Sequence, residues 1–137
     1  MISDSLAYFC EDIGIGIVGV DIFVRQQPES PDNCITIYDE TGIVLAQNQA
    51  YDMDTFGSQF LFRGSYEWVS GKALEVHRNI AGLSGKEVPF PGDIELISTQ
   101  IQSVPAFIGN DDRGRVQYSA HYLHDCKIGH NAHRTEK

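Results

Sequence analysis

Apolar and polar residues alternate along two neighbouring stretches in the first third of the chain. Every second residue is apolar from Val20 to Val24 and again in Cys34–Tyr38, and this two-residue period is typical of β-strands. Two prolines between them each fix φ and remove a backbone donor, so residues 27–33 are expected to form a turn. The polar run Asp39–Gly42 is expected to end the second strand.

A spacing of three to four residues between apolar positions predicts a first helix at Ser3–Gly14. Ser3 or Ser5 can cap its start, and Gly14 can end it. The apolar stripe consists of Leu6, Phe9, Cys10 and Ile13. Because Cys10 lies on this stripe, we expect it to be a small buried hydrophobe rather than a nucleophile.

The strongest helical pattern covers Tyr66–Leu83, after Ser65, which is expected to cap it. Its apolar seam is expected to pack on the sheet and consists of Tyr66, Val69, Ala73, Val76, Ile80 and Leu83. Trp68 falls beside the seam, where partial burial at the sheet edge is expected and a contact with a partner is the alternative. His77 and Arg78 are expected to face solvent.

Alternation predicts three further strands. The first is Phe56–Arg63, with Arg63 at a solvated end; its one face carries Phe56, Ser58, Phe60 and Phe62. The second is Ile94–Gln102, which continues past a kink at Pro105 because a proline cannot donate within a sheet. A charged turn at residues 110–115 then leads into Val116–Leu123, which closes a hairpin.

These elements predict an α+β fold with a mostly antiparallel sheet of four to five strands and two helices packed on one face. A chain of 137 residues is most simply one domain, here assigned to residues 1–123. Residues 124–137 carry histidines and basic residues and almost no large apolar side chain, so they are expected to form an extended or flexible tail.

Composition narrows the function classes. No apolar run approaches the length of a membrane span, and three widely spaced cysteines favour reduced thiols over disulfides or a zinc site. A net charge of −9 argues against a protein that grips the phosphate backbone of nucleic acid. The acidity is compatible with DNA that slides past, or simply with solubility.

The sharpest chemical candidate is a set of metal-ligand residue types near the C-terminus: His121, His124, Asp125, Cys126, His130 and His133. If the last strand continues, His121 and His124 fall on opposite faces and cannot share a metal. No paired-cysteine or His-Glu-x-x-His motif supports the site. We therefore expect no catalytic residue, metal or other cofactor, and a small metal-dependent enzyme using this histidine cluster stays an alternative.

Two motifs resemble the tail terminator family of long-tailed bacteriophages, whose members are also described as tail-completion or minor capsid proteins. The first is Pro28–Asn33 followed by Ile35–Asp39, and the second is Ser103–Gly109 with its charged turn and closing strand. The order of helices and strands is also similar over roughly residues 3–123. Neither motif carries chemistry, so the resemblance implies ancestry and fold.

The resemblance implies a structural virion protein that terminates the tail tube and joins it to the head connector. Family members act as rings, generally of six subunits, around the channel through which the genome leaves. The implied partners are other copies of the chain, the connector or adaptor protein and the tail tube protein, with DNA passing unbound. The implied location is the head–tail interface of the virion, after assembly in the host cytoplasm. A protein-interaction module outside any virus is a further alternative.

Contacts with partners are expected from segments that the core does not need. One is the unusually long connection at residues 42–55, which is read as an arm or as a short extra hairpin. The others are the turn at residues 111–115 and the tail at residues 124–137. The candidate contact residues are Ile43, Val44, Leu45, Tyr51, Met53, Trp68, Asp111, Asp112, Arg113, Arg115, His130 and His133.

Overall fold

The computed structural model describes residues 2–43, 53–81, 83 and 94–128. In chain order its elements are α1 (Ile2–Asp12), β1 (Ile22–Val24), β2 (Cys34–Ile43), β3 (Met53–Gly64), α2 (Tyr66–Ile80), β4 (Ile94–Asn110) and β5 (Val116–Ile128). The five strands form one sheet in the order β1-β2-β3-β5-β4. Every pair is antiparallel except β1 with β2. The predicted α+β class is confirmed.

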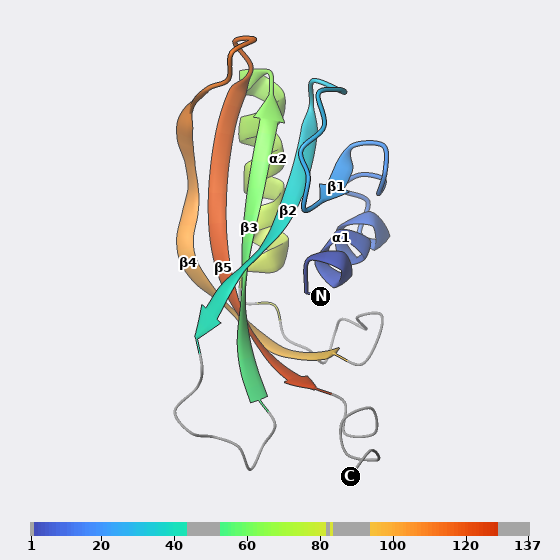
Figure 1. Ribbon diagram of the computed structural model, residues 1–137, viewed down its shortest axis with the longest axis vertical. Helices are drawn as coiled ribbons and strands as arrows, with labels where there is room; N and C mark the ends of the chain where they lie inside the picture. The colour runs from blue at the N-terminus through green and yellow to red at the C-terminus, as the bar shows by residue number, and fades with distance from the viewer. Residues whose placement is uncertain (1, 44–52, 82, 84–93, 129–137) are drawn as a thin grey trace.

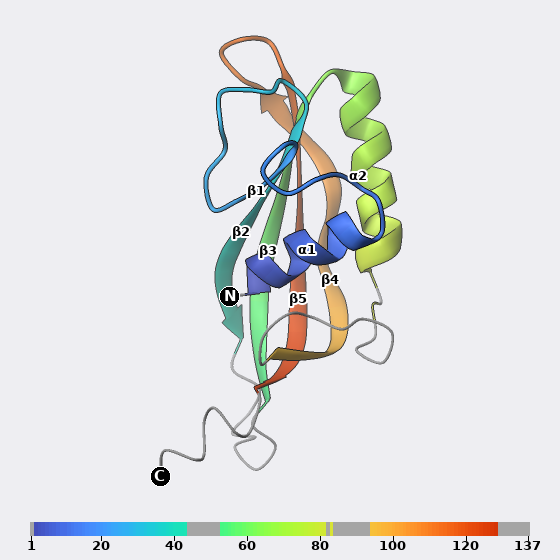
Figure 2. The same cartoon turned by 90° about the vertical axis from the view of Figure 1, so that its right-hand side faces the viewer.

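Both helices lie on the same face of the sheet, and no helix of the described residues covers the other face (Figure 1, Figure 2). One apolar core fills the space between the helices and the sheet. Its largest buried side chains are Tyr122, Phe60, Phe62, Ile2, Leu6, Ile22, Ile35, Ile37, Ile80 and Leu96. None of the described helices is both long and apolar enough to span a membrane.

Helix α1 is anchored by a side chain from a distant strand. Asp39 of β2 accepts hydrogen bonds from the Ser3 backbone N–H at 3.0 Å and from the Ser3 hydroxyl at 2.7 Å. The predicted cap at Ser3 or Ser5 is therefore wrong, since both serines lie inside the helix and are buried. Asp39 satisfies a first-turn N–H that the helix itself cannot pair. The glycine expected at the end, Gly14, has a φ of 84°.

The two strands of the first pair differ from their predicted lengths in opposite directions: β1 is shorter than predicted and β2 is longer. Strand β1 has only three residues and pairs in parallel with Ile35–Ile37, while Val20 lies outside it and is exposed. Strand β2 continues through the polar run that was expected to stop it, ending at Ile43. A register shift between Glu40 and Ile43 accommodates this run. The turn chemistry of residues 39–42 is overridden by pairing with β3.

Strands β3 and β5 form the centre of the sheet. Phe60 and Phe62 share one face of β3, as predicted, and that face packs on the core. Phe60 meets Tyr122 of β5 edge to face, with ring centroids 5.6 Å apart. The predicted end of the last strand at Leu123 is wrong, because β5 runs to Ile128 and buries His124, Asp125 and Cys126. Residues 129–137 of the predicted tail lie outside the described residues.

Helix α2 follows its predicted seam closely. Its N-terminus is capped as expected, with the Ser65 hydroxyl accepting from the Trp68 N–H at 3.4 Å, and it ends at Ile80 rather than at residue 83. The buried seam consists of Val69, Ala73, Val76 and Ile80. Tyr66 is exposed instead of buried. His77, which was expected to face solvent, is partly buried, and its Nδ1 lies 2.7 Å from the Tyr122 hydroxyl of β5.

Strand β4 is one long edge strand that continues past Pro105 as predicted, with a register shift between Ser103 and Ala106. Proline is tolerated at position 105 because an edge strand can lack a ladder donor on its free side. Register shifts at four places along its pairing with β5 break the predicted alternation. The shift between Leu96 and Ser98 leaves Ile97 exposed while Leu96 and Thr99 are both buried. Ile101 shares the face of Thr99 and pairs with Tyr122, but it is exposed at the edge of the sheet.

Candidate functional site

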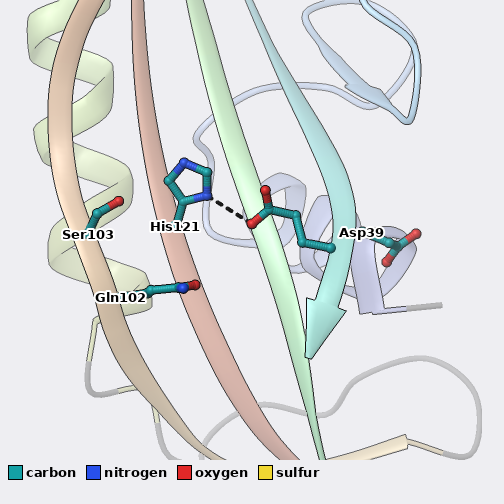
Figure 3. Close-up of a pocket in the computed structure, with 5 residues that line it drawn as sticks. Asp39, Gln102, Ser103 and His121 are labelled. Carbon is teal, nitrogen blue, oxygen red and sulfur yellow. Dashed lines mark hydrogen bonds and ion pairs between the residues drawn. The ribbon is translucent and has the colours of Figure 1, made fainter. Parts of the chain in front are cut away.

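The face of the sheet opposite the helices carries polar side chains and a cleft. We call it the open face (Figure 2). The paired residues Tyr38, Gln59 and His121 share this face, because they alternate with the buried residues of β2, β3 and β5. A cleft of about 780 Å³, open to solvent, lies there. Its lining consists of Asp39, Glu40, Gln102, Ser103 and His121 (Figure 3).

A chain of hydrogen bonds crosses the open face beside this cleft. His121 Nδ1 lies 2.8 Å from Glu40 Oε1, and its Nε2 lies 3.1 Å from Ser119 Oγ (Figure 3 shows the first contact). The Gln59 amide donates to the same serine oxygen at 3.0 Å. In Figure 3 the Asp39 side chain points away from His121, and it is held by Ser3. These bonds tie β2, β3 and β5 together.

The order serine, histidine, glutamate has the geometry of a hydrolase triad, which sequence reasoning did not find. The signal would have been the spacing of Ser119 and His121, since residues two apart on a strand share a face. Two observations argue against a nucleophile. Ser119 is almost fully buried and its oxygen already accepts from Gln59. Both described helices lie on the other side of the sheet, so neither N-terminus can stabilise an oxyanion here.

A second polar cluster lies further along the open face. The carboxylate of Asp125 accepts from Thr55 Oγ1 at 2.7 Å, Ser98 Oγ at 3.1 Å and Gln100 Nε2 at 2.9 Å. Three donors compensate the burial of this carboxylate. The cluster links the outer strand β4 through β5 to β3, so it is a structural brace for the edge of the sheet.

Part of the predicted contact turn at residues 111–115 makes hydrogen bonds within the chain itself. Arg115 is buried, donating from Nε to Asp111 Oδ2 at 2.7 Å and from Nη1 to the Glu29 carbonyl at 2.7 Å. Its guanidinium is therefore already bonded to Asp111 and to the loop between β1 and β2. Asp112 and Arg113 are exposed and keep their side chains at the surface. Of the predicted turn residues, these two are the ones available to a partner.

Arg63 is a structural residue and not a solvated strand end. It is 2% exposed, and its guanidinium donates to three backbone carbonyls, those of Glu29, Pro31 and Asp32, at 3.3, 2.7 and 3.3 Å. Arginine suits this place because its planar fork presents several donors at once. The proline-containing loop is thus pinned to the end of β3, and the prediction of a solvated end is wrong.

The remaining predicted contact residues are unevenly placed. Trp68 is half-buried and packs against the core, as expected for the sheet edge. Ile43 ends β2 and Met53 begins β3, so both belong to strands rather than to an arm. The others lie outside the described residues: Val44, Leu45, Tyr51, His130 and His133.

The histidine and cysteine chemistry weighed above finds no support in the described part of the chain. As predicted, His121 and His124 lie on opposite faces, the first against Glu40 and the second in the core. Burial raises the pKa of the Cys10 thiol to about 12, so it stays protonated at neutral pH. Among residues 2–43, 53–81 and 94–128, no group of three His, Cys, Asp or Glu side chains is placed to hold a metal ion.

Two exposed apolar surfaces were missed at the sequence level. The first, which we call the β4 edge, consists of Ile97, Ile101, Val104, Phe107 and Ile108. The second, the α1 flank, consists of Tyr8, Ile13, Ile17 and Val20. A signal for the first was present, because no charged residue occurs between Leu96 and Asn110. These surfaces lie at opposite edges of the sheet, with β4 on the left and α1 on the right of Figure 1.

Comparison with known proteins assigns the family. A search of curated proteins gave no match. A family model described as bacteriophage tail terminator protein matches residues 9–126, which run from α1 through all but the last residues of β5. The match therefore covers most of the chain and nearly all of the sheet. The chain belongs to the bacteriophage tail terminator protein family and is a structural protein of the phage tail.

Proposed function

We propose that this chain closes the growing end of the phage tail tube as a ring, generally of six subunits, and joins the tube to the head connector. Membership of the tail terminator family is the observation that carries the proposal. Its partners are then other copies of itself, the tube protein and the connector, at the head–tail interface of the virion. Assembly takes place in the host cytoplasm.

The charge of the chain supports a place around the DNA channel. With a net charge of −9, the protein repels the phosphate backbone instead of binding it. A ring with such walls lets the genome pass without holding it. The open face of the sheet has a polar network around Glu40 and His121, and its bonds are made within the subunit.

None of the three alternatives is favoured by an observation. The metal-dependent enzyme would need a ligand cluster, and none is formed by the described side chains. The serine–histidine–glutamate chain has no oxyanion donor from either described helix. An interaction module outside any virus is disfavoured by the family match.

Electron microscopy of lysates made by a phage lacking this chain tests the proposal. We expect DNA-filled heads lying apart from tails that are overlong and irregular, because nothing stops tube growth or joins the two parts. Supplying the chain from a plasmid should restore joined particles with normal tails. Joined particles of normal tail length in the absence of the chain would overturn the proposal.

A further inference from the structure

The β4 edge lacks the charged side chains that protect many outer strands. Edge strands of soluble proteins normally carry charged side chains that prevent pairing with another molecule. Here the stretch from Leu96 to Asn110 has no charge at all, in a chain with 21% charged residues. Val104, Phe107 and Ile108 are each more than half exposed. Only the register shifts and one proline interrupt the strand, so this edge is suited to a permanent partner.

The α1 flank is a second apolar surface of a different kind. Ile17 and Val20, 56% and 57% exposed, lie in the connection between α1 and β1, and Tyr8 is exposed on α1 itself. Exposed acidic residues such as Asp12 border this surface. If two α1 flanks faced each other, their acidic residues would repel. The β4 edge has no charged residue, so an α1 flank that faces it meets no such repulsion.

The placement of the two surfaces favours a second copy of this chain as the occupant. A ring requires contacts that are heterologous, with one patch of each subunit meeting a different patch of the next. The β4 edge and the α1 flank are unlike, both apolar, and at opposite edges of one sheet (Figure 1). A symmetric pair of β4 edges would instead give a closed dimer and leave the α1 flank uncovered.

We propose that the β4 edge of one subunit packs on the α1 flank of the next. Val104, Phe107 and Ile108 supply one side of the contact, and Ile17 and Val20 supply the other. The inference rests on the proposed function in one respect, since the ring is the assembly in which the contact repeats. It adds the surfaces through which neighbouring subunits meet.

Cysteine pairing tests this contact directly. Val104→Cys and Val20→Cys place one new thiol on each surface, while the native Cys10, Cys34 and Cys126 are buried. The variants are supplied singly, as a mixture, or combined in one chain, and tails isolated from lysates are treated with a short bis-maleimide. We expect no covalent dimers from either single variant, dimers from the mixture, and a ladder of multimers from the double variant.

Three results would overturn the contact. Dimers from Val104→Cys alone would mean that two β4 edges meet symmetrically. A bond from Val104→Cys to another tail protein would mean that the tube or the connector covers this edge. Absence of any covalent multimer from the double variant would mean that the two surfaces are not in contact.

A matched pair of charge variants gives an independent readout. Val104→Asp with Phe107→Asp places two carboxylates on the β4 edge, and Leu74→Asp places one at a similarly exposed position of α2. We expect at least a tenfold loss of joined particles with the first variant and none with the second. Circular dichroism must show that both are folded. Full activity of the folded β4 variant would contradict the contact.

The two proposals can fail separately. If the β4 variant terminates tails normally while a phage without the chain makes overlong tails, the function stands and the contact is wrong. If the phage without the chain makes normal particles, the function is wrong whatever the cysteine pairs show.

Discussion

His124 is the clearest case of a residue whose surroundings change its chemistry. It is fully buried, with Nε2 2.7 Å from the Ser58 hydroxyl and Nδ1 3.0 Å from the Thr99 hydroxyl. Burial lowers the pKa of its imidazole to about 4, although the nearby Asp125 acts in the opposite direction. The ring is therefore neutral at physiological pH, and each nitrogen has a hydroxyl that can complement its protonation.

Acid should weaken the fold through this residue. Between about pH 6.5 and pH 4 the unfolded chain binds a proton on His124 that the folded chain excludes, so the free energy of unfolding falls as pH falls. The contribution is on the order of 3 kcal/mol across that window. Urea unfolding at a series of pH values gives the free energy of unfolding at each pH. This free energy should fall less steeply with falling pH for His124→Gln than for the natural chain.

Val76→Ala is the control for that experiment, because it removes buried apolar contacts without touching a titratable group. It should lower the free energy of unfolding by roughly 1–3 kcal/mol at every pH and keep the natural slope. Equal slopes in all three proteins would show that His124 does not carry the effect.

At the scale of elements, the loop between β1 and β2 is held by two arginines from other strands. Arg63 from the end of β3 and Arg115 from the start of β5 both donate to the Glu29 carbonyl. Each also reaches Asp32, the first at its carbonyl and the second at its side chain. The loop has no secondary structure of its own over residues 25–33, so these bonds determine its position.

Replacing Arg63 should therefore cost more than replacing an exposed arginine nearby. Arg63→Leu removes the buried guanidinium that donates to three loop carbonyls, and we expect the free energy of unfolding to fall by about 2–4 kcal/mol. Arg113→Leu alters an exposed side chain whose ion pair with Glu29 is 3.5 Å long, and should change stability by less than about 0.5 kcal/mol. Urea denaturation measures both, and similar losses would contradict the role given to Arg63.

Strand β4 was predicted from the sequence, but which of its side chains face the core was not. Its apolar residues predicted a strand, but the register shift between Leu96 and Ser98 puts both Leu96 and Thr99 in the buried layer and leaves Ile97 exposed. A shift of one residue reverses which side chains face the core. The shifts depend on how β4 pairs with β5, so alternation within β4 alone could not reveal them.

At the scale of the whole molecule, the balance between charge and apolar surface governs association. Copies with a net charge of −9 repel each other, while the β4 edge and the α1 flank attract. Salt screens the first effect and leaves the second, since the Debye length falls from about 30 Å at 0.01 M to about 3 Å at 1 M.

Raising the salt concentration should therefore promote self-association of the purified chain. Sedimentation velocity at a fixed protein concentration should give a larger weight-average mass at about 0.5 M than at about 0.02 M salt. The Val104→Asp, Phe107→Asp variant should lose this dependence, and Leu74→Asp should keep it. A mass that falls with salt would mean that ion pairs hold the subunits together instead.

Local pattern alone determined much of this protein. The sequence correctly predicted the spacing of the seam from Val69 to Ile80, its Ser65 cap and the shared face of Phe60 and Phe62 in β3, because these features depend on residues close in sequence. The two motifs at residues 28–39 and 103–109 also pointed to the family that the match over residues 9–126 then showed.

Tertiary structure decided what depends on partners distant in sequence. Asp39 caps α1, Arg63 holds a loop, and His124 lies in the core, each through contacts with residues more than twenty positions away. The position of β4 at the edge of the sheet likewise follows from strand order and not from its own residues. Burial, charge pairing and exposure are properties of the assembled sheet, so the uncharged stretch of β4 could be recognised as an exposed apolar edge only once the strand order was known.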